Sequence, residues 1–154
     1  MKPILFPLFI LSLTLFGCST TKTQPNSPSM QGITGFVYEA KGNKMPMKGA
    51  PKNPPKPLQC TVLVFEPTNI TDVDPSTATT LYTSIRSKQV ASVDTDSTGY
   101  FKVNLPIGKY SLFIKQGDRF YANSFDQFNN IALFEVLESK FSEAKLTVNK
   151  AATY

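Results

Sequence analysis

The fold is decided by residues 96–114, which read DSTGYFKVNLPIGKYSLFI. Apolar and polar residues alternate in 100–105, which is the period of a strand with one buried face. The break at 106–108 contains Pro and Gly, which favour a tight turn, and 109–115 alternates again. Two such runs predict a hairpin whose apolar face must be covered by a second sheet. The residues expected on that face are Phe101, Val103, Leu105, Tyr110, Leu112 and Ile114, whereas Ser111, Phe113 and Lys115 are expected on the other.

Further strands are predicted wherever the same alternation or a short apolar run recurs. In 32–39, Ile33 and Val37 fall on one side and Phe36 and Tyr38 on the other. Counted at this spacing, about seven strands are expected, which is typical of a β-sandwich. The sequence therefore predicts an all-β fold, a seven-stranded antiparallel β-sandwich. Its other strands are expected at 60–66, at 81–85 and 89–93 with an interruption at 86–88, at 131–137 and around 144–148.

Composition limits the chemistry that the chain can perform. The chain has 154 residues and a net charge of +5, which is too small and too dispersed to indicate a nucleic-acid partner. Histidine is absent, and with it the commonest general base and metal ligand. The two cysteines, Cys18 and Cys60, cannot build a disulfide framework or a thiolate metal cage. We therefore assign no catalytic residue, no metal ligand and no cofactor.

The first eighteen residues indicate export and lipidation. A positive start is followed by an almost wholly apolar segment, 4–16, which is too short for a stable membrane span. The segment Leu15-Phe16-Gly17-Cys18 resembles a bacterial lipobox, in which the cysteine thiolate takes the lipid. We predict a signal peptide at 1–17 and a lipidated Cys18 that begins a flexible linker, 18–31. The alternative is an ordinary secretory leader in which Cys18 is incidental.

The residues after Cys18 indicate where the protein is delivered. Ser19, rather than Asp, follows the cysteine, which by resemblance to lipoproteins of two-membrane bacteria indicates the outer membrane. No acidic cluster occurs in 19–24, so a surface-export signal is not visible. We expect a lipid-anchored protein of the outer membrane that faces the periplasm.

Two segments are candidates for a binding surface. Residues 41–57 contain five lysines, five prolines and no acid, which predicts an exposed basic loop for lipid head groups or anionic polysaccharide. The alternative is a solvated loop whose lysines only maintain solubility. Residues 117–130 are rich in turns and aromatics, which could bind a sugar or instead close the end of the sandwich. The candidates are Lys44, Lys48, Lys52, Lys56, Tyr121, Asn123 and Asp126.

Two further features have a structural and a functional interpretation. The segment Asp94–Gly99 has the carboxylate spacing of a calcium loop, but position 105 is Leu where a closing Glu is needed. A polar turn in which Gly99 takes a special backbone angle is the alternative. Cys60 has no histidine to activate it and is expected to be a small buried residue in a strand.

The opening stretch also carries a family resemblance. The pattern Asp96-x-x-Gly99-x-Phe101 followed by Leu105-Pro106-x-Gly108-x-Tyr110-x-Leu112 resembles the carboxypeptidase regulatory-like domain. The resemblance extends over 32–154. This part of the chain is also similar to small lipoproteins of the Bacteroidota type that carry such a domain. It implies a transthyretin-like, Greek-key β-sandwich that serves as an accessory module. It transfers no site residue, because the pattern defines a scaffold.

These observations lead to one expectation and two alternatives for function. The expectation is a non-enzymatic, outer-membrane-anchored lipoprotein whose β-sandwich binds an unidentified partner. Its partners would be membrane lipid, through acylated Cys18, and an envelope protein or glycan. One alternative is a structural or assembly component that acts through sheet-edge contacts. A hydrolase with paired carboxylates is the other, although no recognisable acid pair is visible.

Substitution of Cys18 tests the predicted lipidation. Replacing it (Cys18→Ser) should move the protein from the membrane fraction to the soluble periplasm, because the acyl chains are lost. Fractionation and intact mass measure this, and Cys60→Ser is the matched control. Unchanged membrane retention of Cys18→Ser would contradict lipidation.

Overall fold

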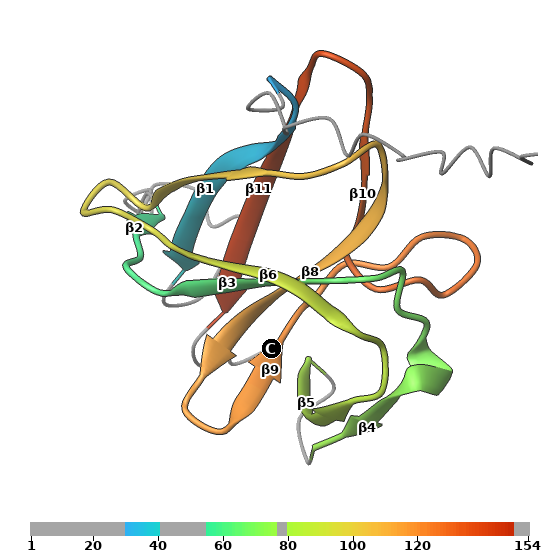
Figure 1. Cartoon of the computed structure of the whole chain (residues 1–154). Coiled ribbons are helices and arrows are strands. Elements are labelled where there is room, and N and C mark those ends of the chain that lie inside the picture. Colours follow the sequence, from blue (N-terminus) through green and yellow to red (C-terminus); the bar gives the residue numbers. More distant parts are fainter. Residues whose placement is uncertain (1–29, 41–54, 77–79, 150–154) are drawn as a thin grey trace, which may run out of the picture.

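A computed structural model describes residues 30–40, 55–76 and 80–149, which form eleven strands and one short 3₁₀ helix, η1 (Ile70–Asp72). These strands lie in a four-stranded and a seven-stranded sheet (Figure 1). The leader, Cys18, Lys44, Lys48 and Lys52 lie outside the described residues. The strands are β1 (Gly32–Ala40), β2 (Lys56–Pro57), β3 (Thr61–Phe65), β4 (Val73–Pro75), β5 (Leu81–Ile85), β6 (Gln89–Asp94), β7 (Tyr100–Asn104), β8 (Gly108–Gln116), β9 (Arg119–Tyr121), β10 (Leu133–Val136) and β11 (Phe141–Asn149).

The prediction of an all-β fold with two facing sheets is confirmed, but the predicted count of seven strands is wrong. The described residues form eleven. The interrupted range 81–93 forms two strands, β5 and β6, and the strands that no predicted range contains, β2, β4 and β9, have only two or three residues each. Such short strands cannot show a period of two, and for that reason the pattern did not reveal them.

The four-stranded sheet is built around β1. Strand β11 pairs with one edge of β1 along its whole length, from Gly32↔Phe141 to Ala40↔Asn149. Strands β7 and β2 share the other edge. The β1–β11 pair is parallel, which corrects the expectation of a wholly antiparallel sandwich. Strands at opposite ends of the sequence can pair in this way because the intervening chain acts as the crossover.

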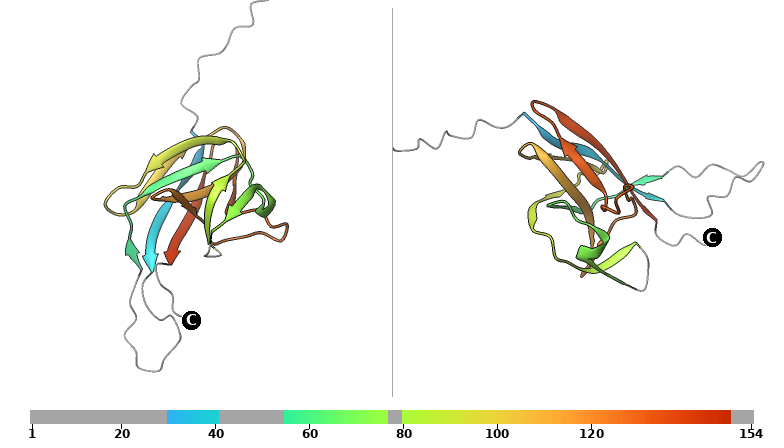
Figure 2. Two further views of the ribbon diagram at one scale, coloured as in Figure 1. Left: turned by 90° about the horizontal axis from the view of Figure 1, so that it is seen from below. Right: turned by 90° about the vertical axis from the view of Figure 1, so that its right-hand side faces the viewer.

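The seven-stranded sheet has the order β4-β5-β9-β8-β3-β6, and β10 pairs with β8 outside this path. All of its pairings are antiparallel. Figure 2 shows the two layers, with β1 and β11 side by side in one of them. Strands β8 and β3 therefore lie in the middle of the molecule, between the small sheet and the segment that carries β4 and β5 (Figure 1).

The predicted hairpin at 100–114 is wrong, because its two strands belong to different sheets. Strand β7 pairs with β1, whereas β8 pairs with β3, β9 and β10. The connection from Leu105 to Ile107 carries the chain from one layer to the other, and Leu105 is buried there. Alternation of apolar residues reports that one face is buried, but it does not identify the neighbouring strand. A hairpin and a crossing between layers therefore have the same sequence pattern.

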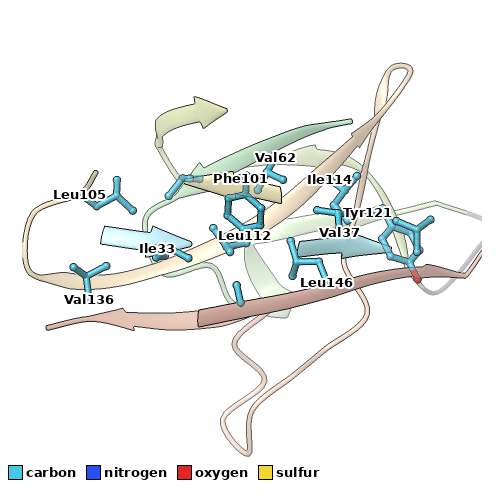
Figure 3. Close-up of a cluster of buried hydrophobic side chains, with 13 residues drawn as sticks. Ile33, Val37, Val62, Phe101, Leu105, Leu112, Ile114, Tyr121, Val136 and Leu146 are labelled. Atoms are coloured by element: carbon cyan, nitrogen blue, oxygen red, sulfur yellow. The ribbon is translucent and has the colours of Figure 1, made fainter. Parts of the chain in front are cut away.

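The main core lies between the two sheets (Figure 3). Ile33 and Val37 of β1 contribute fully buried side chains from the small sheet. The alternation predicted for 32–39 is therefore confirmed. The other buried members are Val62, Val64, Phe101, Leu105, Leu112, Ile114, Tyr121, Val136, Ala144, Leu146 and Val148.

A second core covers the other face of β3 and β8, and it corrects the expected exposure of Phe113. The Phe113 ring is fully buried and meets Phe65 edge-on, with ring centroids 5.5 Å apart. Tyr82 of β5 also meets it edge-on, at 5.9 Å. Tyr110, which was expected in the core, is only half-buried, and its hydroxyl donates to the Pro106 carbonyl oxygen. A strand buried on both faces cannot be recognised from alternation.

Loop 122–132 contributes to this second core. Ile131 and Ala132 are buried in it, but they precede β10, so the strand predicted at 131–137 is shorter than expected. Ala132 has a φ of 42°, a left-handed conformation that interrupts an extended strand. Cys60 likewise lies just before β3 and is half-buried rather than inside the strand.

Replacement of Phe113 tests the second core. We expect Phe113→Ala to lower the free energy of unfolding by about 3–5 kcal/mol, because it removes a fully buried ring. Urea denaturation measures the change. Tyr110→Ala is the matched control and should cost less, since its ring is half-buried. Equal costs for the two variants would contradict burial of Phe113 on a second face.

Candidate functional site

The outer face of the four-stranded sheet carries three neighbouring aromatic rings. We call Phe36, Tyr38 and Tyr100 the aromatic platform. The rings of Phe36 and Tyr38 stack with centroids 6.1 Å apart and planes inclined by 21°. The rings of Phe36 and Tyr100 lie 5.4 Å apart at 59°. Phe36 is 40% exposed and Tyr100 is 36% exposed, so both offer ring surface to solvent.

The platform follows from strand alternation and register. Phe36 and Tyr38 are two residues apart in β1, so both point away from the core that Val37 enters. The β1–β7 register places Phe36 directly opposite Tyr100. The hydroxyls of Thr34 and Tyr100 are hydrogen-bonded at 2.9 Å, which ties the same two strands one step further along. Aromatic pairs across strands stabilise a sheet, so part of the platform's role is structural.

Two lysines border the platform. The Lys102 ammonium lies 4.2 Å from the centroid of the Phe141 ring, and that of Lys145 lies 5.8 Å from the centroid of Tyr38. Cation–π contacts of this kind are worth about 0.5–1 kcal/mol at exposed sites. Lys145 stands opposite Phe36 in the β1–β11 register. Among the residues of β11 on the same face as Lys145, the one acid is Glu143, which stands opposite Thr34. The face therefore combines ring surface with positive charge.

A polar turn between β6 and β7 positions Tyr100. One Asp96 carboxylate oxygen accepts hydrogen bonds from the Thr98 amide at 2.8 Å and the Tyr100 amide at 3.0 Å. The Thr98 hydroxyl donates to the same oxygen. Gly99 has a φ of +76°, and its carbonyl accepts from the Val37 amide at 2.8 Å. A Cβ at Gly99 would lie 2.4 Å from the Val37 carbonyl oxygen. The interpretation of 94–99 as a turn is confirmed.

The hydrogen bonds at this turn change the acidity of Asp96. The Thr98 hydroxyl, followed by the Tyr100 amide, lowers the pKa of the Asp96 carboxyl below its ordinary value of 3.8. The charged form is therefore the one that holds the turn together. Because this carboxylate oxygen already accepts three hydrogen bonds, the structure uses it to shape the backbone.

Tyr121 and Asn123, two of the predicted site residues, are bonded to the edge of β11. Tyr121 is buried, and its hydroxyl accepts from the Asn149 amide at 3.0 Å and donates to the Thr147 carbonyl at 3.3 Å. The Asn123 side-chain amide donates to the same carbonyl at 3.1 Å. The Tyr121 ring is therefore part of the core rather than of a binding surface. For Tyr121, the structure therefore agrees with the alternative interpretation, in which the aromatics of 117–130 close the end of the sandwich.

Asp126, a third predicted site residue, organises its own loop. Its carboxylate accepts from the Phe128 amide at 2.8 Å and the Asn130 amide at 2.9 Å. The Asn130 side-chain amide also donates to it at 2.8 Å. This last bond is the main cause that lowers the Asp126 pKa below 3.8. The carboxylate thus holds Phe128 in an exposed position without forming a site with Tyr121.

The predicted basic loop is represented by Lys56 alone among the described residues. Lys56 is exposed in β2, opposite Glu39 of β1. The structure consequently places no group of the predicted lysines together, and their role as a contact surface stays a prediction.

Two hollows in the described parts of the chain were considered as ligand sites. An open hollow of about 470 Å³ lies where 58–61 and 114–117 diverge, and Cys60 is among its lining residues. A second hollow, beside Tyr121, has only about 10 Å³. No group of three or more His, Cys, Asp or Glu side chains that could hold a metal occurs in the described residues. Within those residues, no helix is long and apolar enough to cross a membrane.

No family model, curated protein or solved structure matches the chain. The fold and the outer face of its small sheet are therefore the basis for any functional argument. The sequence did place Phe36 and Tyr38 on the side of their strand opposite Ile33 and Val37, and Tyr100 and Lys102 on the side opposite Phe101 and Val103. It could not show that they form one surface, since that depends on the pairing of β1 with β7 and β11.

Acid titration tests the role of Asp96. Its folded pKa is lowered, so the stability it contributes is present above the unfolded value and is lost as pH falls below about 3.8. We expect the melting temperature to fall in this range, and to fall less in Asp96→Asn. Asp118→Asn, in the exposed turn after β8, is the control and should retain the wild-type profile. An Asp96→Asn profile that coincides with the wild type would contradict this role.

Proposed function

We propose that the protein is a non-enzymatic lipoprotein that is anchored through Cys18 to the periplasmic side of the outer membrane. Its β-sandwich is a binding module, and its ligand occupies the aromatic platform. The observation that carries the proposal is the combination of Phe36, Tyr38 and Tyr100 with two lysines on one solvent-facing sheet. An outward face of a sandwich is ordinarily polar, so exposed rings there indicate a contact surface.

The chemistry of the platform fits a glycan with acidic groups. Aromatic rings offer flat apolar surface, against which the C–H face of a sugar can pack. Lys102 and Lys145 stand at the border of the platform, where they can pair with a carboxylate or phosphate on such a sugar. Hydrogen-bonding partners for sugar hydroxyls are also present, in Thr34 and Tyr100. A sheet face of this kind suits an extended polymer better than a small molecule, which requires an enclosed pocket.

The accessory role in the proposal is supported by the lack of paired acid groups at the platform among the residues that the structure describes. The acid that β11 presents beside these rings is Glu143, and acid-pair hydrolysis of a glycoside needs two carboxyl groups across the bond. The chain contains no histidine that could replace one of them. The transthyretin-like, Greek-key family assignment is also part of the proposal, and its support is the two-sheet all-β architecture.

A second candidate function, assembly through a sheet edge, is favoured by β6. This strand is the last one of its sheet and, within the described part of the chain, pairs only with β3. Charge and proline are the devices that usually protect an edge, and in β6 (Gln89–Asp94) they are limited to the terminal Asp94. The outer edge of β11, by contrast, is bonded at Thr147 and Asn149 by Tyr121 and Asn123. An added strand would therefore pair with β6.

Variants of the platform test the proposed function. We expect a glycan array to show preference for acidic glycans, and Phe36→Ala or Tyr100→Ala to weaken binding about 2- to 10-fold through lost ring contacts. Lys102→Ala should reduce the salt dependence of binding as well. Lys115→Ala, an exposed lysine of β8, is the matched control and should bind as the wild type does.

Two outcomes would decide against the platform. Wild-type affinity in both aromatic variants would place the ligand elsewhere on the molecule. Absence of any glycan ligand, together with a crosslinked protein partner that is lost in Val90→Lys, would favour assembly through the exposed edge of β6.

A further inference from the structure

Four apolar residues are exposed together at one end of the sandwich. We call Met30, Pro106, Ile107 and Leu137 the apolar tip. Met30 is 78% exposed, Ile107 60% and Leu137 48%. Single exposed apolar residues are normal on a soluble domain, whereas a group that shares one end of the molecule marks a contact surface.

Strand register brings these residues together. Val136 stands opposite Gly108 in the antiparallel β8–β10 pair, so Leu137 and Ile107 occupy the next opposing positions. Gly32 stands opposite Asn104 in the β1–β7 pair, and the Leu105 amide donates to the Gln31 carbonyl at 3.3 Å. Continuing this register, Met30 falls opposite Pro106. Figure 1 shows the β7–β8 and β10–β11 connections at the same end as the start of β1.

The tip is held in place by Gln31. Its side-chain oxygen accepts from the Ser139 amide at 3.1 Å, and its side-chain nitrogen lies 3.5 Å from the Leu105 carbonyl oxygen. The next residue, Gly32, donates its amide to the Lys140 carbonyl at 3.1 Å. The two connections and the start of β1 therefore form one unit. The backbone that carries the tip is therefore ordered before binding, which lowers the entropic cost of a contact.

Charged residues around the tip are of both signs, with exposed lysines available to lipid phosphates. Lys109 follows the β7–β8 connection, and Lys140 precedes β11. The acids on these segments are Glu135 and Glu138. Apolar side chains that enter the interface, bordered by lysines that contact head groups, are the composition of a peripheral membrane contact.

The position at which the chain enters the domain indicates which partner the apolar tip contacts. The twelve residues from Ser19 to Met30 connect Cys18 to this end of β1, and when fully extended they span at most about 40 Å. We propose that the apolar tip rests on the lipid leaflet that holds the acyl chains of Cys18. This inference rests on the lipidation contained in the proposed function. It also orients the molecule: β1 points away from the membrane, and the aromatic platform faces sideways into the periplasm.

Depth-dependent fluorescence quenching tests the contact. The full-length lipidated protein, with Cys60→Ser, is reconstituted in phosphatidylethanolamine–phosphatidylglycerol vesicles and labelled at Ile107→Cys or Leu137→Cys. Asp118→Cys, in the turn at the opposite end of β8, provides the control label. We expect brominated lipids to quench the labels at 107 and 137, and the label at 118 to keep its full intensity. The substitutions Met30→Asp and Ile107→Asp should abolish quenching at 137 while the protein remains in the vesicle fraction.

The outcomes separate the inference from the function on which it rests. Unquenched labels at 107 and 137 on protein that sediments with vesicles would overturn the inference and leave the lipid anchor intact. Labels that are shielded from aqueous iodide in native membranes, yet unquenched by lipid, would assign the tip to a protein partner and also overturn it. Equal quenching at 118 would contradict the orientation. A Cys18 without acyl chains by intact mass would overturn the proposed anchoring, and the inference with it.

Discussion

The parallel pairing of β1 with β11 is the constraint on which the rest of the structure depends. It joins the two ends of the described chain over nine residues of β1. Gly35 permits the close approach, because a Cβ at this position would lie 1.9 Å from the Ala144 carbonyl oxygen. With β1 held between β11 and β7, its inward residues Ile33 and Val37 enter the core and its outward residue Phe36 joins the platform. Core stability and surface chemistry therefore share one strand.

The connections between the layers explain where the two proposed surfaces lie. Besides the step from β2 to β3 at 58–60, the chain passes between the sheets at 95–99, at 105–107 and at 137–140. The first of these crossings positions Tyr100 on the platform through Asp96. The other two, joined by Gln31, form the apolar tip beside the start of β1. A ligand surface on a sheet face and a membrane contact at the sheet end can then be occupied at the same time, because they lie on different sides of the molecule.

The polar residues that are most conspicuous in the sequence have structural roles. Asp96 and Asp126 each accept backbone amides within their own turns. Tyr121 and Asn123 bond the outer edge of β11, which prevents that edge from pairing with another chain. Side chains that satisfy backbone groups resemble a binding site in the sequence, because the same residue types serve both purposes. The rings of the aromatic platform, by contrast, contact one another across paired strands and do not hold a turn or a strand edge in place.

The sequence by itself determined the all-β class, the approximate strand positions at 32–39, 81–85 and 89–93, and the inward phase of Leu112 and Ile114. These features depend on alternation along one strand, which neighbouring residues encode. Only the tertiary structure decided that β7 and β8 separate into different sheets, that β1 and β11 run parallel, and that Phe113 is buried. The platform and the tip belong to this second group. Their residues are far apart in the sequence, and only the register between strands brings them to one surface, since a two-residue period specifies a face and leaves the partner strand open.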